Sequence, residues 1–169
     1  MEAFDLWLHG PATWLATTPL SKFLQDQHAY AFATLETLHL IGMTLVLGAI
    51  GAFDLRVLGL ANAIPPAALH RLIPWGVAGF LLNLATGTLF VIAHPHQYLF
   101  DPAFRVKLLL MLLAGLNVVA FYGTAFDELK AVPAGTAPPL RSRVITGISL
   151  TAWVGVLVCG ALVSSGFFG

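Results

Sequence analysis

The sequence predicts an all-α fold, namely an integral membrane four-helix bundle with short N-terminal interfacial helices. Hydrophobic residues make up 58% of the 169-residue chain and charged residues only 9%, so too few polar side chains exist to cover a soluble domain of this length. Four apolar runs reach the roughly 20 residues that a helix needs to cross a bilayer. The formal net charge is zero and no basic patch occurs, so nucleic acid is not an expected partner.

The first segment, residues 1–28, is expected to form one or two short interfacial helices. It carries Trp7 and Trp14 among sparse charges, and its apolar runs are too short to span a membrane. Tryptophan side chains favour the headgroup region, where the ring is apolar and the N–H reaches water. The start "MEAFDLWLHG" has neither a basic region nor a following cleavage site, so it does not resemble a cleaved signal peptide.

Residues 29–169 are predicted to form one domain of four transmembrane helices. The third helix has a clear start, because Asp101 suits a helix N-cap and Pro102 suits the first helical position. The loop "KAVPAGTAPPLRSR" is rich in proline and glycine and is expected outside the membrane. The predicted spans are 30–53, 71–93, 103–126 and 143–167.

The distribution of basic residues predicts the orientation. The first and third loops hold five of them, and the opposite side holds three. Because cytoplasmic loops carry an excess of Lys and Arg, we expect a bacterial inner (cytoplasmic) membrane protein with both termini on the periplasmic side. The five are Arg56, Arg71, Lys130, Arg141 and Arg143, and the three are Lys22, Arg105 and Lys107.

Small and polar residues recur at helical spacing and predict the packing faces of the spans. Helices in lipid associate through close contact of small residues and through interhelical hydrogen bonds. The expected ridges are Gly79, Asn83 and Gly87 in the second span, Asn117, Ala120 and Thr124 in the third, and Gly147, Thr151 and Gly155 in the fourth.

The stretch "ETLHLIGM" places ionisable groups inside the first apolar run. At 100° per residue, His28, Glu36, His39 and Met43 fall within an arc of about 80°. Ionisable residues inside a membrane are costly and often functional, so this face is the leading candidate site. Glu36 is expected to be protonated, paired with His39 or engaged with a cation. The alternative is a structural pair hydrogen-bonded to Asn83 or Thr86.

A transition-metal site is the first hypothesis for this face. A carboxylate, an imidazole and a thioether at i, i+3 and i+7 suit a copper ion, particularly Cu(I). Histidines near the outer end could supply an access route for the ion. The candidate metal ligands are Glu36, His39, Met43, His28, His94 and His96. A periplasmic metal carrier would be a fitting partner.

Three other functions stay open at this stage. Haem b could lie between His28 and either His94 or His96, with Arg105 and Lys107 near the propionates. Glu36 and His39 could relay protons or a small solute. The bundle could also be an accessory structural subunit of a larger membrane complex. No nucleophile–base pair or phosphate-binding loop occurs, so no catalytic residue is assigned.

Three further residues raise structural questions. Asp54 and Arg56, two residues apart near the end of the first span, should point to different sides, and Arg56 is expected to snorkel or to clamp a neighbouring loop. Trp153, deep in the fourth span, needs a hydrogen-bond partner for its N–H.

The runs "ETLHLIGMTLVLGAIGAFDLRVLGL", "LIPWGVAGFLLNLATG" and "DPAFRVKLLLMLLAGLN" resemble a family of small bacterial four-span membrane proteins of unassigned function. The resemblance covers the chain from about Tyr30 onward and includes Glu36, Thr37 and His39. The layout is also distantly similar to the membrane domain of bacterial copper-resistance proteins that work with a periplasmic copper carrier. This second likeness favours copper by analogy.

Overall fold

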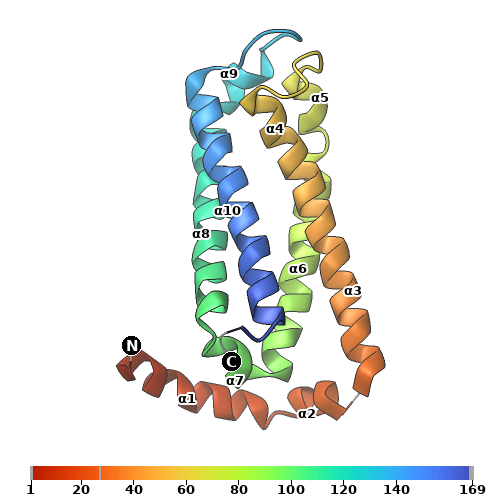
Figure 1. The fold of residues 1–169 in the computed structure, drawn as a ribbon, viewed down its shortest axis with the longest axis vertical. Helices are drawn as coiled ribbons and strands as arrows, with labels where there is room; N and C mark the ends of the chain where they lie inside the picture. The colour runs from red at the N-terminus through yellow and green to blue at the C-terminus, as the bar shows by residue number, and fades with distance from the viewer. Residues whose placement is uncertain (1, 27, 168–169) are drawn as a thin grey trace.

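The computed structural model describes residues 2–26 and 28–167, which form helices joined by short loops, with no β-strand in these ranges (Figure 1). Four helical stretches are long and apolar enough to cross a membrane, which confirms the predicted four-span architecture and indicates a multi-pass membrane protein. Their apolar surfaces suit a lipid bilayer. The four stretches are Phe32–Leu58, Pro66–Ala93, Pro102–Thr124 and Leu140–Ser164.

Two N-terminal helices, α1 (Glu2–Ala16) and α2 (Pro19–Asp26), lie across the end of the bundle at which α10 (Leu140–Ser164) also finishes (Figure 1). Polar contacts attach both to the bundle. The Arg105 guanidinium lies 2.5 Å from the Asp5 carboxylate. The Gln25 side chain donates to the Ala93 carbonyl at 2.7 Å, and so satisfies a backbone acceptor at a helix C-terminus.

The first span is interrupted, which hydropathy does not predict. It consists of α3 (His28–Val46), a π-helical turn η1 (Leu47–Gly51) and α4 (Ala52–Leu58). A π turn holds one extra residue, so it changes which face of the helix points inward. Accordingly, α3 packs chiefly against α6 (Ile73–Ala93), whereas α4 packs chiefly against α10.

Short helices complete the connections between the spans. They are α5 (Pro66–His70) before α6, α7 (Pro95–Leu99) before α8 (Pro102–Thr124), and α9 (Phe126–Lys130) after it. At the start of α8, the Asp101 carboxylate accepts from the Phe104 N–H at 3.1 Å, as expected for an N-cap.

Glycines bring α3 and α6 into backbone contact. A Cβ on Gly79 would lie 2.6 Å from the Gly42 carbonyl oxygen, and a Cβ on Gly42 would lie 2.9 Å from the Gly79 carbonyl oxygen. Any larger side chain at either position would therefore force the two backbones apart. The predicted role of Gly79 is confirmed, but Gly87 meets only the His39 ring, at 3.6 Å.

The ridges predicted for the other two spans are wrong in part. Thr151 is exposed and donates to Gly147 in its own helix, while Ala120 and Thr124 are also exposed. Hydroxyl-bearing side chains that satisfy their own helix gain little by facing a partner, so small size alone does not define the packed face. The buried residues of α10 are Ser142, Thr146, Ser149, Ala152, Val156, Cys159 and Val163.

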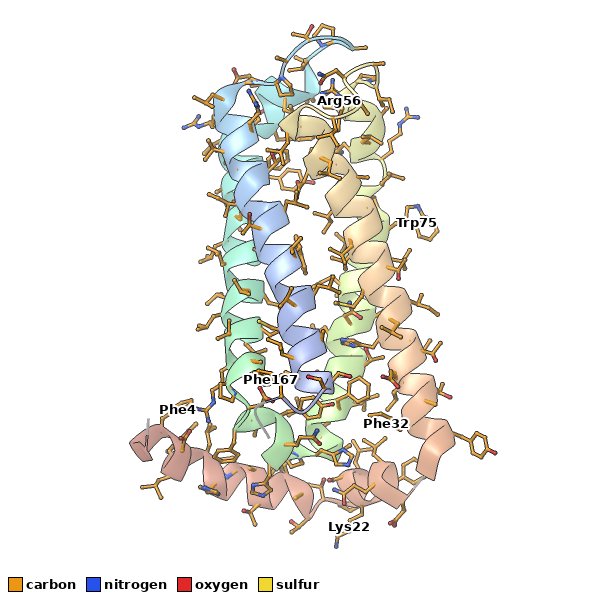
Figure 2. All side chains as sticks on the ribbon, viewed as in Figure 1. Phe4, Lys22, Phe32, Arg56, Trp75 and Phe167 are labelled. Atoms are coloured by element: carbon orange, nitrogen blue, oxygen red, sulfur yellow. The ribbon has the colours of Figure 1, made fainter. Side chains whose placement is uncertain are left out.

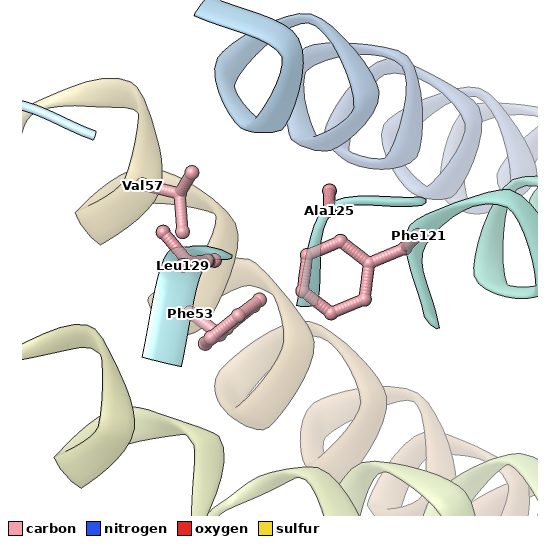
Figure 3. Packing of buried hydrophobic residues seen from close by; sticks show 5 residues of the cluster. All are labelled: Phe53, Val57, Phe121, Ala125 and Leu129. Carbon is pink, nitrogen blue, oxygen red and sulfur yellow. The ribbon is translucent and has the colours of Figure 1, made fainter. Parts of the chain in front are cut away.

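An apolar cluster packs α4 against α8 and α9 at the end of the bundle remote from α1. It comprises Phe53, Val57, Phe121, Ala125 and Leu129 (Figure 3). The rings of Phe53 and Phe121 meet edge to face with centroids 5.6 Å apart. Their contact connects α4 to α8, and so closes the bundle at this end.

Arg56 lies inside the bundle near this end, whereas Trp75 projects outward from α6 (Figure 2). The Arg56 guanidinium donates to the carbonyls of Asn62 and Ile64 and to the Asn62 side chain. The expectation that Arg56 clamps a neighbouring loop is therefore confirmed.

Candidate functional site

His39 on α3 is held in a defined orientation by α6. Its Nδ1 lies 2.7 Å from the Thr86 hydroxyl oxygen. That hydroxyl donates its own proton to the Leu82 carbonyl at 2.8 Å, so the imidazole must be the donor in the His39–Thr86 contact. Nδ1 therefore carries the proton, and Nε2 keeps an unprotonated lone pair. Nε2 makes no hydrogen bond with the part of the chain that the structure describes.

Asn83 fixes the backbone next to this histidine. With its amide oriented to satisfy both polar atoms, the nitrogen donates to the His39 carbonyl at 2.6 Å and the oxygen accepts from the Met43 N–H at 3.0 Å. Asn83 thus bridges α6 to α3 through the main chain. Both Asn83 and Thr86 lie beside the predicted site, and Thr86 forms the hydrogen bond that the structural alternative anticipated.

Glu36 does not pair with His39. It is exposed, and it forms no hydrogen bond or ion pair with any described residue. Met43 is half-buried and lies one turn beyond His39. Together with His39, these two side chains line one cavity, so the structure does bring the three together around a common space.

This cavity, which we name the polar cavity, has a volume of about 490 Å³ and lies between α3, α6, α7, α8 and α10. Its size is within the range of small-molecule pockets in proteins. Its lining is Phe32, Glu36, His39, Leu40, Met43, Phe90, Gln97, Tyr98, Phe104, Lys107, Leu157, Gly160, Ala161, Val163 and Ser164.

A second space, the apolar cavity, adjoins the first. It has a volume of about 280 Å³ and shares His39, Met43, Phe104 and Lys107 with the polar cavity. Its other lining residues are Phe80, Asn83, Leu84, Gly87, Thr88, Val91, Leu99, Leu108, Met111, Trp153 and Val156. Ionisable side chains thus lie where an apolar space meets a more polar one.

Lys107 is the unexpected member of the site. It is half-buried on α8, and its ammonium group forms no hydrogen bond or ion pair with any residue in the described ranges. A Cβ on Gly160 would lie 3.6 Å from Lys107 Nζ, an ordinary van der Waals distance, so the ammonium lies close to α10. A half-buried cation without an anionic or hydrogen-bonding partner is costly among apolar helices.

Trp153 on α10 lines the apolar cavity, and its ring meets Phe80 edge to face with centroids 6.0 Å apart. Its indole N–H is buried and has no hydrogen-bond partner in the described chain. The partner expected from the sequence is therefore not found among the described residues. Trp153 and Lys107 give the joined cavities two donors without acceptors.

Tyr98 on α7 lines the polar cavity. Burial raises the pKa of its phenol, and the nearby carboxylate of Glu36 raises it further. The electrostatic influence of Glu36 on Tyr98 places both groups around the same space.

The histidines predicted at the rim do not converge on His39. His94 is exposed and meets the edge of the Phe32 ring, with centroids 6.5 Å apart. His96 is exposed and stacks on Phe100 at 5.9 Å. The side chain of His28 lies outside the described residues.

The described side chains contain no group of three or more His, Cys, Asp or Glu residues placed to hold a metal ion. His39 is also the only histidine among the described lining residues of the two cavities, so a haem there would lack a second histidine ligand. The copper and haem hypotheses therefore stay predictions.

His39 could be recognised from the sequence, whereas the sequence placed Lys107 only at the outer end of the bundle. The available signal was its position, five residues inside an apolar helix that starts at Pro102. Such a lysine is a functional candidate for the same reason as Glu36.

No family model, curated protein or solved structure matches the chain, so the resemblances noted from the sequence stay expectations and the site is interpreted from its own geometry.

Proposed function

We propose that this protein binds an amphipathic molecule from the bilayer, with an oxygen-bearing, anionic or carbonyl head at Lys107 and an apolar body in the apolar cavity. The observation that carries the proposal is the Lys107 ammonium, which lies where the two cavities meet and has no hydrogen bond or ion pair with a described residue. A bound carboxylate, phosphate or quinone oxygen would satisfy it.

The other polar groups around Lys107 fit the same ligand. Trp153 offers a second donor, and the Nε2 lone pair of His39 accepts a proton or a hydrogen bond. Pockets of this kind join apolar walls to a few polar groups that fix ligand orientation. Phe104 and Met43 line both cavities and would contact the ligand between its head and its body.

The test is to identify the molecule that co-purifies with the protein. The wild type and Lys107→Met are purified in a mild detergent, and their bound lipids are extracted and analysed by mass spectrometry. Methionine preserves the length and apolar stem of lysine but removes the charge. We expect one amphiphile near one equivalent in the wild type and at least about tenfold less in Lys107→Met, a loss of roughly 1.4 kcal/mol or more.

Lys22→Met is the matched control, because Lys22 is exposed on α2 and lies outside both cavities. Equal retention in Lys107→Met and Lys22→Met would refute the proposal. Fatty acids, phospholipids and quinones are separated in the same spectrum, which distinguishes the possible sources of the head group.

Copper binding is the second candidate function, and one observation favours it. The Nε2 lone pair of His39 has no hydrogen bond to a described residue, and Met43 and Glu36 line the same cavity. Against it, Lys107 adds a positive charge to that cavity. Elemental analysis of the purified protein after incubation with Cu(I) is the test. A metal content that is zero, or equal in wild type and His39→Ala, would end this candidate, and a missing Soret band would end the haem alternative.

We further infer that α1 and α2 lie at the membrane surface on the periplasmic side of a bacterial inner membrane. The exposed side chains of Trp7 and Trp14 support this, since tryptophan favours the interface. The excess of basic residues at the opposite end of the bundle supports the orientation. A reporter that is active only in the periplasm should be active when it is fused after residue 169. The same reporter should be inactive when it is inserted in the loop at 131–139.

A further inference from the structure

A second polar site lies near the other end of the bundle, around Asp54 on α4. The Asp54 side chain is buried, with the residue only 2% exposed, and its Oδ2 atom has no hydrogen-bond partner in the described chain. Arg56 does not neutralise it, because that guanidinium is directed at the loop residues Asn62 and Ile64. An unpaired carboxylate in this setting is costly.

Oxygen atoms from two other helices surround the same space. The Ser149 hydroxyl of α10 lies beside the Asp54 carboxyl, and both line the same cavity. On α8, the Asn117 amide nitrogen donates to the Ile145 carbonyl at 3.1 Å, which leaves its oxygen without a hydrogen bond to a described residue. The Thr146 hydroxyl donates to the Ser142 backbone carbonyl at 2.9 Å, so the hydroxyl oxygen retains its lone pairs.

These residues line a cavity of about 130 Å³. A water molecule occupies about 30 Å³ in the liquid, so the space suffices for an ion with a few waters. Asp54 is the only acidic or basic residue among the described residues that line it. The cavity shares no lining residue with the polar and apolar cavities, so it is a separate site.

The charge of the site selects the kind of occupant. One carboxylate balances one monovalent cation, whereas a divalent ion would leave a net positive charge among apolar helices. Carboxylate, hydroxyl and amide oxygens are hard ligands, which suit alkali and alkaline-earth cations rather than copper or zinc. From this geometry we propose that Asp54, Ser149, Asn117 and Thr146 form a binding site for a sodium ion between α4, α8 and α10.

The π-helical turn supports the placement. It ends at Gly51, three residues before Asp54, and Ile50 within it lines the same cavity. π turns leave backbone carbonyls without their usual α-helical partners and are frequent at functional sites. The turn also rotates α4, which packs against α10, so that Asp54 reaches Ser149.

The experiment compares thermal unfolding of the detergent-purified protein in sodium chloride and in choline chloride at equal ionic strength, at about pH 8, where an ordinary aspartate is ionised. Sodium should raise Tm by roughly 2–8 °C through preferential binding to the folded state. Asp54→Asn, which keeps the shape and removes the charge, should unfold at a temperature independent of sodium. Asp127→Asn, at an exposed carboxylate near the same end, should respond as the wild type does.

Direct binding of radioactive sodium provides a second measurement if Asp54→Asn does not fold. Ser149→Ala should then bind sodium at least several-fold more weakly than the wild type. The proposal is overturned if choline and sodium give the same wild-type Tm, if Asp54→Asn keeps the full sodium response, or if Ser149→Ala binds sodium as tightly as the wild type. Stabilisation by acid alone would instead identify Asp54 as a protonated structural residue.

Discussion

The His39 imidazole donates from Nδ1 to the Thr86 hydroxyl, and this single contact sets the chemistry of the candidate site. Because the hydroxyl proton is directed to the Leu82 carbonyl, the tautomer of the histidine is fixed. The lone pair on Nε2 is thereby made available for a ligand. The buried polar residues of α6 therefore do more than hold two helices together.

Replacing Thr86 by valine tests this role. Valine preserves the shape of the side chain but cannot accept the hydrogen bond from the imidazole N–H. We expect a modest loss of stability, about 0.5–1.5 kcal/mol, and weaker retention of the ligand because the ring loses its fixed orientation. Thermal unfolding and lipid analysis measure the two effects. Thr44→Val is the control, since Thr44 is exposed, lines neither cavity, and its hydroxyl donates only within its own helix. Equal ligand loss in both variants would contradict the interpretation.

The contact between Gly42 and Gly79 predicts opposite outcomes for two glycine-to-alanine substitutions. Gly79→Ala should destabilise the bundle by about 1–3 kcal/mol, because the new methyl group meets backbone atoms that cannot move freely. Gly115→Ala on α8 meets nothing within 4 Å and should stabilise the helix by about 0.5–1 kcal/mol. Thermal unfolding of both variants checks the sign of each effect. A tolerated Gly79→Ala would show that α3 and α6 are farther apart than described.

The hydrogen bonds of Arg56 predict that lysine cannot replace it. Lysine lacks the planar fork that contacts Asn62 and Ile64 together, and it would bury a charge with fewer partners. We expect Arg56→Lys to cost about 1.5–3 kcal/mol, measured as a lower Tm. Arg71→Lys, at an exposed position, should leave Tm unchanged. Equal Tm values for the two variants would mean that the loop does not depend on the guanidinium.

The pKa of Tyr98 reports on the polar cavity. Burial and the Glu36 carboxylate both raise it, so the phenol should ionise later than an ordinary tyrosine as the pH rises. Glu36→Gln removes one cause and should lower the pKa of Tyr98, while burial keeps it above the usual value. Absorbance titration, with Tyr98→Phe to identify the relevant component, measures this change. An unchanged titration in Glu36→Gln would place Glu36 away from Tyr98.

The same shift affects stability only at high pH. Below about pH 10, the phenol is neutral in both the folded and the unfolded state, so it contributes no dependence on pH. Above that value the unfolded chain releases the proton more readily, and the folded state is progressively destabilised. Tyr98→Phe should therefore reduce the loss of stability in strongly alkaline solution.

The four spans could be predicted because length and apolarity decide them, and the Asp101 cap because its signal is local. The face carrying His39 could also be recognised, since one ionisable residue in an apolar run is conspicuous. Because lysine is charged, the sequence predicts Lys107 near the outer end of the bundle. In the structure, its neighbours on the other helices make it part of the candidate site. How deep a long side chain lies in the bundle, and which way it points, depend on its neighbours. A single sequence does not reveal which residues those neighbours are.

The wrong assignments have a similar cause. Glycine and threonine spacing marks several possible helix faces, and the partner helix decides which one is buried. In α10 that face carries Thr146 and Ser149 rather than Thr151. Separate histidines likewise suggested convergence at the rim, whereas His94 and His96 contact different aromatic rings.

The π-helical turn Leu47–Gly51 gives the first span two helical phases, one directing Gly42 to α6 and the other directing Asp54 to α10. Deleting a single residue there would restore a continuous α-helix and swing everything beyond it by about 100°. The span would keep its hydrophobicity, yet its two halves could no longer serve both neighbours at once. The extra residue of the π turn therefore lets one transmembrane span pack against two different helices without a loop between its two halves.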